Sequence, residues 1–352
     1  MVARRIVLPG SNGAVLAHFR APIRFAFAYG SAVFPQKSYS PAHPPPVRDF
    51  VFAVSHPGHW HSINLHQNPV HYSLPARLIG SPAIAWLQDH APGAGLWFNL
   101  RATVNQTVIK YGVVSIDTLC NDLLDWNTLY LSGRMHKPID ILRDHPRVRL
   151  AQQVNFVSAL RTALLLLPET FVERELYRTI AGLSYIGDFR MRWAENPHKV
   201  NNIVAGQAEL FRSIYHPLII ALSSHVNIQH LSSHSPHHTF TQDVSPRARA
   251  ELLAKLPIRL RERIRTVYDR RWNLQSAFPS ATNLPLSTSD EIDILTKMAA
   301  DRDFQPTLRD ALVDIVARPA LFQSLKGIVS AGPVKSVSYA AQKVLKRFTA
   351  SS

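Results

Sequence analysis

The pattern of apolar and polar positions divides this chain into a part with the character of strands and a longer part with the character of helices. Residues 25–29 (Phe-Ala-Phe-Ala-Tyr) and 48–54 (Arg-Asp-Phe-Val-Phe-Ala-Val) are short apolar and aromatic runs. Such runs are typical of buried strands. Residues 96–100 and 107–114 have the same character. We therefore expect residues 1–115 to form a small mixed α/β domain with three or four strands.

From Ile116 onward the apolar residues recur at helical spacing. Residues 154–167 form a strongly amphipathic run, which we expect to be a helix that ends before Pro168. Thr170 is followed three residues later by Glu173, which is the spacing of a capping box. A further helix is therefore expected to begin at Thr170.

The last helical pattern covers residues 336–348, after a break at Gly332-Pro333. Its apolar positions fall on one stripe and comprise Val337, Ala340, Ala341, Val344, Leu345 and Phe348. Its cations fall on the other side and comprise Lys343, Lys346 and Arg347. A basic amphipathic helix of this kind suits an anionic membrane surface, and docking on the body of the protein is the alternative.

Charge and composition restrict the class of partner. The 352 residues carry a net charge of +15, which favours a polyanionic partner such as nucleic acid, an anionic membrane or a phosphorylated substrate. The single cysteine, Cys120, rules out an internal disulfide and a cysteine zinc site, and it favours a reducing compartment. No apolar run approaches the roughly 18 residues of a membrane-spanning helix, so we expect a soluble or peripheral protein. The first 48 residues contain no Asp or Glu, a bias that is compatible with a mitochondrial matrix address.

The first two expected strands frame a candidate phosphate site. Gly30 and Ser31 form a turn after the first strand, where backbone N–H groups and a hydroxyl can hold a phosphate. Asp49, the first acidic residue of the chain, opens the second strand and can place a divalent metal on that phosphate. This is the outline of a nucleotidyltransferase signature, except that Val51 stands where a second carboxylate is usual. Lys110 interrupts a later apolar strand and either reaches out of an edge or points at an anion.

Two further regions contain polar residues whose role the pattern leaves open. In residues 182–191, Asp188 and Arg190 occupy alternate positions, which share a face if the backbone is extended. A solvated cluster of salt bridges with nearby Lys199 is the simpler interpretation. Residues 216–243 are rich in histidine, but the spacing fits no zinc pattern, and we expect a surface loop.

Seven motifs in order resemble those of the mitochondrial translocator assembly and maintenance protein family, which are mitochondrial phosphatidate cytidylyltransferases (CDP-diacylglycerol synthases). The motifs are Tyr29-Gly30-Ser31, Asp49-Phe50-Val51-Phe52, Trp60-His61-Ser62, Lys110-Tyr111-Gly112-Val113, Leu167-Pro168-Glu169, the run from Gly182 to Met191, and Lys199-Val200-Asn201-Asn202-Ile203-Val204. The resemblance runs from about residue 25 to the tail and is weaker through residues 216–320.

The resemblance implies an α+β protein with four parts. These are a nucleotidyltransferase-fold mixed sheet domain (1–115), a helical winged-helix-like domain (116–215), a helical region with a His-rich loop (216–330), and a C-terminal basic amphipathic helix (331–352). It also implies a peripheral protein on the matrix side of the mitochondrial inner membrane. The reaction would join CTP and phosphatidic acid into CDP-diacylglycerol and pyrophosphate, with Mg²⁺, on the route to cardiolipin.

The resemblance and the residue chemistry together assign roles to eight residues. The groups expected to bind the CTP phosphates or another phosphate are Tyr29, Gly30, Ser31, Arg190 and Lys199. The groups expected to act in catalysis are Asp49, Lys110 and Asp188. Asp49 is also the expected Mg²⁺ ligand, and Asp188 is our inference for the carboxylate that Val51 does not supply.

Two other function classes remain open at this point. A nucleotidyltransferase that acts on RNA would account for the positive charge and would bind RNA in a salt-sensitive way. The sequence contains no aromatic and basic surface motif for it, and no nucleic acid is expected. A non-catalytic assembly factor for mitochondrial protein import would fit the family's name and the missing carboxylate. Such a factor would keep its function with both Ser31 and Asp49 replaced.

Overall fold

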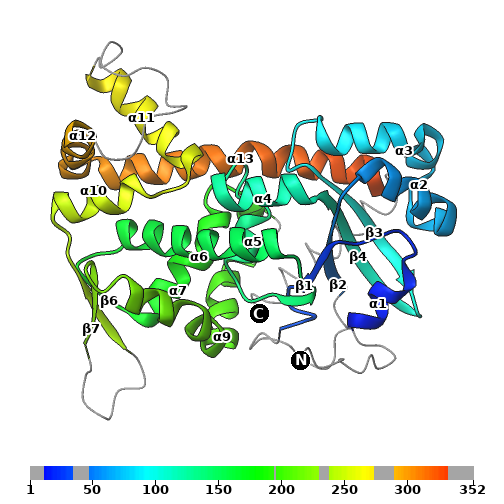
Figure 1. The fold of residues 1–352 in the computed structure, drawn as a ribbon, viewed down its shortest axis with the longest axis horizontal. Helices are drawn as coiled ribbons and strands as arrows, with labels where there is room; N and C mark the ends of the chain where they lie inside the picture. Colours follow the sequence, from blue (N-terminus) through cyan, green and yellow to red (C-terminus); the bar gives the residue numbers. More distant parts are fainter. Residues whose placement is uncertain (1–11, 35–46, 194–195, 230–237, 273–288, 332–352) are drawn as a thin grey trace.

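A five-stranded mixed sheet forms the core of the N-terminal part of the chain, and its strand order is β3-β4-β2-β1-β5 (Figure 1). The computed structural model describes residues 12–34, 47–193, 196–229, 238–272 and 289–331. The strands are β1 (Phe25–Tyr29), β2 (Arg48–Val54), β3 (Leu96–Val104), β4 (Thr107–Ser115) and β5 (Asp140–Arg143). Strand β2 runs parallel to β4, and the other neighbouring pairs are antiparallel.

The four strands expected from the apolar runs are confirmed, and the first two have the expected bounds. The fifth strand was not expected. It belongs to the segment after residue 115, and it joins the sheet by pairing with β1, where Ile141 lies opposite Phe27. The sheet therefore draws on more of the chain than residues 1–115.

Both faces of the sheet are buried, which explains why its strands are apolar at nearly every position. Phe25 and Phe27 of β1 point to one face, where they join the apolar residues of α4 (Ile116–Asp125), α5 (Ser132–Met135) and α6 (Pro146–Leu166). Phe50 and Phe52 of β2 point to the other face, where α1 (Asn12–His18) and α2 (Pro57–Gln67) cover them. Burial of each phenylalanine contributes roughly 1.5–3 kcal/mol.

A local cap starts the first helix after the sheet. Ser115 ends β4, and its Oγ accepts a hydrogen bond from Thr118 N at 2.9 Å. Helix α4 therefore begins at the next residue, as Ser at an N-cap favours. The helix ends at Asp125, and the next residue, Trp126, adopts a left-handed conformation with φ of 58°.

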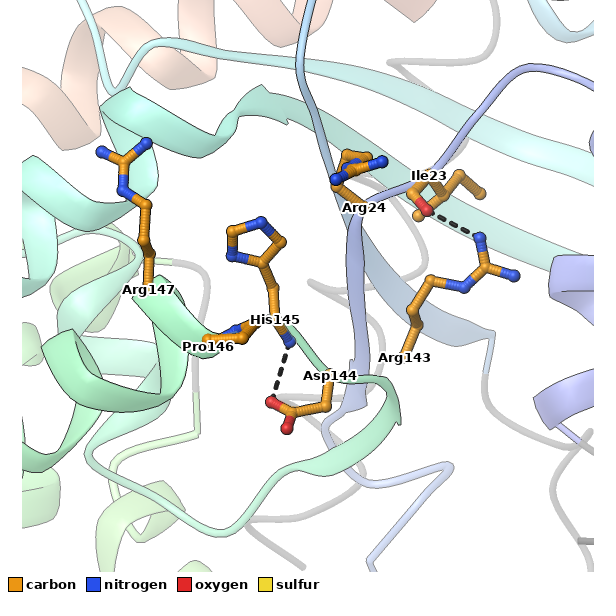
Figure 2. A pocket seen from close by; sticks show the side chains of 7 residues that line it. All are labelled: Ile23, Arg24, Arg143, Asp144, His145, Pro146 and Arg147. Carbon is orange, nitrogen blue, oxygen red and sulfur yellow. Dashed lines mark hydrogen bonds between the residues drawn. The ribbon is translucent and has the colours of Figure 1, made fainter. Parts of the chain in front are cut away.

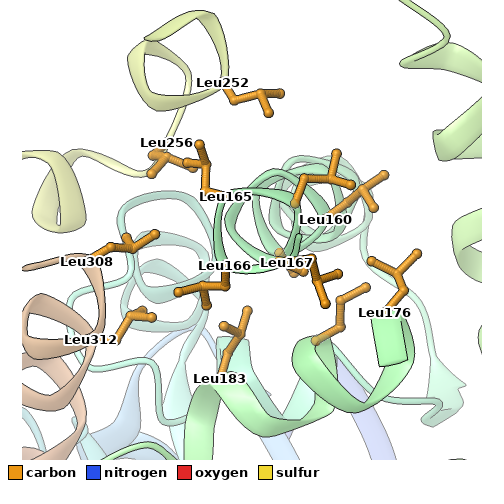
Figure 3. Packing of buried hydrophobic residues seen from close by; sticks show 14 of the residues in the cluster. Leu160, Leu165, Leu166, Leu167, Leu176, Leu183, Leu252, Leu256, Leu308 and Leu312 are labelled. Carbon is orange, nitrogen blue, oxygen red and sulfur yellow. The ribbon is translucent and has the colours of Figure 1, made fainter. Parts of the chain in front are cut away.

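The remainder of the described chain is mainly helical and packs around α6. Figure 3 shows leucines of α6, such as Leu160 and Leu165, enclosed by leucines of other helices. From Ser158 to Leu166 nearly the whole circumference of α6 is buried, which is why this half of the helix lacks a wide polar face. The remaining helices are η1 (Pro69–His71), α3 (Leu74–Asp89), α7 (Glu173–Gly182), η2 (Leu183–Tyr185), α8 (Arg190–Trp193), α9 (Lys199–Ala221), α10 (Pro246–Ala254), α11 (Ile258–Trp272), α12 (Ser289–Ala300) and α13 (Phe304–Ala331).

A small antiparallel sheet lies beside these helices, in the order β6-β8-β7. Its strands are β6 (Thr170–Val172), β7 (Val226–Gln229) and β8 (Thr239–Gln242). The helix expected to begin at Thr170 is therefore a wrong prediction. Thr170 pairs with Thr241 in this sheet, and the helix begins at Glu173 instead. Glu175 Oε2 accepts a hydrogen bond from Val172 N at 3.1 Å, so the acid of the cap lies two residues later than the pattern suggested.

Helix α13 connects the two parts of the molecule (Figure 1). It packs against α6, α11 and α12 at one end and against β3 and α3 at the other. The surface loop expected over residues 216–243 is a wrong prediction for the described part of that stretch, because residues 216–221 belong to α9 and residues 226–229 and 239–242 pair as β7 and β8. Residues 230–237 lie outside the described residues, as does the expected amphipathic helix at 336–348.

Candidate active site

Tyr29, Asp49 and Lys110 form one row across three neighbouring strands. The strand register pairs Tyr29 with Asp49 and Asp49 with Lys110. Directly paired residues point to the same face of a sheet. Lys110 Nζ lies 3.2 Å from Asp49 Oδ1, and it also lies 4.3 Å from the centre of the Phe98 ring. The structure therefore brings together three of the residues that the sequence selected.

The Gly30 turn lies directly beside this row. Gly30 has φ of +86°, a conformation that favours glycine, and its carbonyl accepts hydrogen bonds from Val33 N and Phe34 N, both at 3.0 Å. A Cβ on Gly30 would lie 3.5 Å from Asp49 Oδ2. The turn that carries Ser31 thus adjoins the carboxylate, as the spacing of the two strands predicted.

An ordered loop after α4 forms the second wall of the site. The buried Asp122 carboxylate accepts hydrogen bonds at 2.8–3.0 Å from the backbone and hydroxyl of Thr128, from Leu131 N, and from the backbone and hydroxyl of Ser132. A carboxylate with this many donors fixes the backbone around it. Tyr130 lies in the middle of this loop and is held against the site.

Arg134 ties that loop to the sheet. Its guanidinium lies 3.8 Å from the centre of the Tyr130 ring and 5.7 Å from the centre of the Tyr29 ring. It also donates a hydrogen bond to the Tyr130 carbonyl. Arginine stacked between two aromatic rings is well placed for planar contact with phosphate oxygens.

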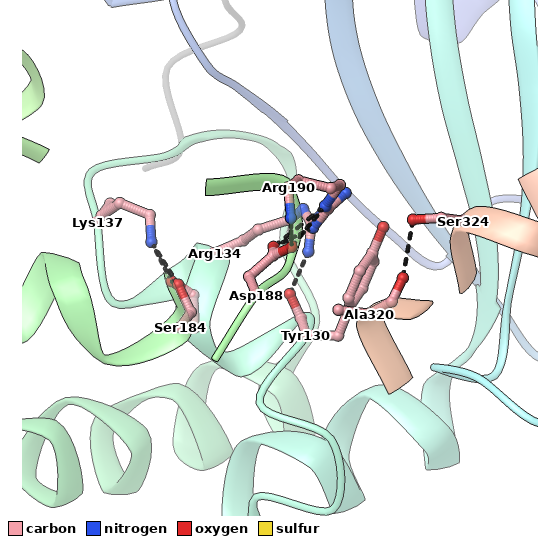
Figure 4. A network of polar contacts seen from close by, with 9 residues as sticks. Tyr130, Arg134, Lys137, Ser184, Asp188, Arg190, Ala320 and Ser324 are labelled. Carbon is pink, nitrogen blue, oxygen red and sulfur yellow. Dashed lines mark hydrogen bonds and ion pairs between the residues drawn. The ribbon is translucent and has the colours of Figure 1, made fainter. Parts of the chain in front are cut away.

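Asp188 and Arg190 form a two-pronged ion pair beside Arg134 and Tyr130 (Figure 4). Arg190 Nε lies 2.9 Å from Asp188 Oδ1, and Nη2 lies 2.5 Å from Oδ2. Burial alone would raise the pKa of Asp188, but the hydrogen bonds and charge of Arg190 lower it below its ordinary value. The two residues lie in a turn and at the start of α8, so they meet by direct pairing and not on one face of an extended strand. Both oxygens of Asp188 are engaged by Arg190.

Lys137 and Lys199 complete the group of cations. Lys137 Nζ donates to the Gly133 carbonyl and, at 3.1 Å, to Ser184 Oγ. The two ammonium groups lie 4.9 Å and 5.1 Å from the centre of the Tyr185 ring. Lys199, selected from the sequence, therefore joins the site through Tyr185.

Positive charge dominates the electrostatics of this group. Burial lowers the pKa of Lys137 to about 8, and the charges of Arg134 and Lys199 contribute. Burial would raise the pKa of Tyr130, but Arg134, Arg190 and Lys110 outweigh it and lower that pKa to about 8. Because three cations lower the pKa of the Tyr130 phenol in spite of its burial, the surroundings of this phenol are short of negative charge. The site is suited to a polyanion such as a triphosphate.

Comparison with known proteins gives the family. The family described as mitochondrial phosphatidate cytidylyltransferase matches residues 13–346. The chain belongs to this family. The relative from Xenopus laevis, named mitochondrial phosphatidate cytidylyltransferase, is 39% identical over 338 residues, which cover 94% of this chain and 93% of the relative. Relatives with the same name from Danio rerio and Schizosaccharomyces pombe are 38% and 36% identical, each over 94% of this chain and over 93% and 82% of their own lengths. The resemblance indicated by the seven motifs is confirmed.

The sequence of this cytidylyltransferase family member contained a signal for the second wall that the motif analysis did not use. The run Ser132-Gly133-Arg134-Met135-His136-Lys137-Pro138 places two cations between a glycine and a proline. Gly133 is needed because a Cβ there would overlap Ser184 and lie 3.3 Å from its Cα. Tyr130, Arg134, Lys137 and Tyr185 were missed because nothing in the sequence shows that this run and residues 184–190 meet.

A basic pocket elsewhere on this family member is not part of the site. It lies at the start of β1, whereas Tyr29 and Gly30 lie at its end, and it is lined by Ile23, Arg24, Arg143, Asp144, His145, Pro146 and Arg147 (Figure 2). Arg143 Nη1 donates to the Ile23 carbonyl at 2.7 Å, and Asp144 Oδ1 accepts from His145 N at 2.8 Å. These side chains stabilise the connection from β5 to α6.

Proposed function

We propose that this chain transfers the CMP group of CTP to phosphatidic acid, forming CDP-diacylglycerol and pyrophosphate for cardiolipin synthesis. The observation that carries the proposal is the row of Tyr29, Asp49 and Lys110 beside the Gly30 turn. Membership of a family named for this activity supports it.

The proposed reaction requires a site for two anionic groups. A phosphate oxygen of the lipid forms a bond to the α-phosphorus of CTP, and the bond between the α- and β-phosphates breaks to release pyrophosphate. Catalysis of phosphoryl transfer rests mainly on positioning and charge stabilisation. Five cations supply this charge, namely Lys110, Arg134, Lys137, Arg190 and Lys199. The Gly30 and Ser31 turn would hold the triphosphate through its backbone and hydroxyl.

Asp49 is the residue that would hold Mg²⁺. Its Oδ1 receives no hydrogen bond among the described residues, although Lys110 lies at ion-pair distance. Mg²⁺ is commonly held by one or two carboxylates together with substrate phosphates, so a single Asp beside a phosphate-binding turn fits it. When bound, the ion would neutralise charge on the phosphates. Asp188 would join it only after release from Arg190, and its direct role in this proposal is to orient Arg190.

We further propose a nucleotidyltransferase-type sheet domain, a winged-helix-like second domain and a peripheral position on the matrix side of the inner membrane. The mixed sheet and the three-stranded sheet beside α7 support the first two. None of the helices that the structure describes is long and apolar enough to span a membrane. The basic amphipathic pattern in residues 331–352 supports contact with an anionic surface.

The decisive test is turnover of labelled CTP with phosphatidic acid in vesicles, with and without Mg²⁺. We expect Asp49→Ala to lower turnover about a hundredfold or more, because it removes the carboxylate that would hold Mg²⁺, and with the ion goes the charge stabilisation of the reacting phosphates. Asp117→Ala is the matched control, since Asp117 is an exposed aspartate that also pairs with a cation, Arg147, at 2.9 Å. Full activity of folded Asp49→Ala would refute the proposed role of Asp49, whereas no turnover by the folded wild-type chain would favour a non-catalytic function.

A further inference from the structure

Helix α3 exposes an unusual amount of apolar surface. Leu78 is 79% exposed, and Val70, just before the helix, is 71% exposed. Leu74, Ile79 and Trp86 are also exposed. Leu74 and Leu78 are four residues apart in the part of α3 before its kink at Gly80, so they share one face of the helix. Trp86 follows the kink. Large exposed apolar side chains gathered on one helix face mark a contact surface.

The C-terminal end of α13 contacts α3. Its distribution of side chains is the reverse of the usual one, with polar residues on the buried side and apolar residues on the exposed side. Its buried side carries polar side chains: Gln323 Nε2 donates to the Leu96 carbonyl at 3.1 Å, and Lys326 Nζ donates to the Gln88 carbonyl at 3.3 Å. Its opposite side carries Leu321, Leu325 and Ile328, which are four and three residues apart and exposed. This helix buries Gln and Lys and exposes three large aliphatic side chains. Its outer face is therefore suited to contact with an apolar medium.

The charged residues around these two helices indicate which apolar medium the exposed faces would contact. Residues 50–88 contain no Asp or Glu, and Arg77 is exposed among the apolar residues of α3, whose one carboxylate is Asp89 at its last position. From the end of α13 the chain continues into residues 332–352, whose sequence holds four cations and no carboxylate. A surface that combines exposed leucines and a tryptophan with cations suits an anionic lipid bilayer.

Helix α13 also borders the active site. Gly187, next to Asp188, lies so close to α13 that a Cβ there would be 3.0 Å from Val313 Cα. Leu321 lies eight residues further along, which is about 12 Å in a helix. The apolar stripe therefore begins on the same helix that contacts the phosphate-binding residues.

We propose that the exposed faces of α3 and the end of α13, which we call the α3–α13 surface, rest on an anionic lipid bilayer. The leucines and Trp86 enter the interfacial layer, and Arg77 meets lipid phosphates. This contact is separate from that of residues 332–352 and presents the active site to lipid headgroups. The proposal draws on the proposed function only for the lipid nature of the substrate.

The test is sedimentation of the full chain with phosphatidylcholine vesicles that contain phosphatidic acid, in the absence of CTP. Two double variants remove the apolar groups, Leu74→Ser with Leu78→Ser on α3 and Leu325→Ser with Ile328→Ser on α13. We expect each pair to lower the vesicle partition coefficient roughly tenfold or more, because inserted apolar area sets the affinity. Leu150→Ser is the matched control, since Leu150 is 70% exposed on α6 and outside the surface.

Two results would overturn the proposal. One is wild-type vesicle binding by both double variants. The other is a lipid-free dimer of the wild-type chain, seen by analytical ultracentrifugation, that becomes monomeric in both variants, because the surface would then be an interface between copies. Since CTP is absent, either result leaves the turnover assay and the proposed function untouched.

Discussion

Substitution of Gly133 by alanine tests how the two loops of the active site are held together. Gly133 lies in α5, and its carbonyl accepts hydrogen bonds from Lys137 Nζ and, at 3.3 Å, from Ser184 Oγ. A Cβ added to Gly133 would lie 3.0 Å from Ser184 Oγ and 3.3 Å from Ser184 Cα, and it would overlap Ser184 Cβ. The segment that carries Ser184 must therefore move away.

The size of this movement sets the expected effect. Restoring ordinary van der Waals distances requires a shift of about 1 Å, and a displacement of that size in a catalytic site costs about a hundredfold in rate. Overpacking of this kind also lowers the free energy of unfolding by about 1–3 kcal/mol. The shift would lengthen the contact between Lys137 and Ser184 and would move the segment that leads to Arg190.

The assay compares Gly133→Ala with Gly182→Ala in urea unfolding and in CTP turnover with phosphatidic acid vesicles. Gly182 ends α7, two residues before Ser184, and a Cβ there would meet nothing within 4 Å. Gly182→Ala should keep full turnover and raise the free energy of unfolding by about 0.5–1 kcal/mol, since alanine restricts the unfolded chain. Equal turnover in the two variants would refute the idea that close contact at Gly133 positions the site.

Two further predictions concern pH and the helical core. The pKa values of Lys137 and Tyr130 are both about 8, so a rise in pH through this value removes a positive charge and adds a negative one. The KM for CTP should therefore rise between about pH 7 and pH 9, less so in Lys137→Met, and a flat profile would contradict the assignment. Arg212→Met should lower the free energy of unfolding by about 3 kcal/mol, because it leaves the buried Glu173 carboxylate without its charged partner at 2.6 Å and, among the described residues, with only the hydrogen bond from Tyr177 Oη at 2.7 Å. Urea unfolding measures this loss of free energy. The control is Arg263→Met, because the ion pair of Arg263 with Asp314 is exposed. Similar losses of free energy in the two variants would argue that burial does not strengthen the pair of Arg212 and Glu173.

The sequence alone determined the local elements of the sheet and one wall of the site. Short continuous runs of apolar residues predict β1 and β2, because such a run, bounded by a turn, is a local property of the sequence. The sequence could place Gly30 close to Asp49, because Gly30 follows the end of one predicted strand and Asp49 lies at the start of the next. The family could also be recognised from the sequence, because the seven motifs and their order can be compared without any knowledge of which residues contact one another.

Local pattern failed where a tertiary contact decided the structure. Thr170 and Glu173 have the spacing of a capping box, yet pairing of Thr170 with Thr241 makes the segment a strand. The partner strand lies about 70 residues away, and no local propensity reports it. β5 was missed for the same reason, because it is four residues long and exists only as a neighbour of β1.

Tertiary structure alone decided the second wall of the active site and the α3–α13 surface. Tyr130 and Arg134 reach the row of Tyr29, Asp49 and Lys110 because Asp122 fixes their loop. Lys137 meets Ser184 because Gly133 admits that serine. The helical spacing of Leu321, Leu325 and Ile328 in α13 is typical of a buried apolar stripe. Only the tertiary structure shows that the opposite side, which carries Gln323, packs against the sheet and that the apolar stripe is exposed. A sequence states which side chains are charged or apolar, but their distance from one another and from solvent is set by how the elements pack.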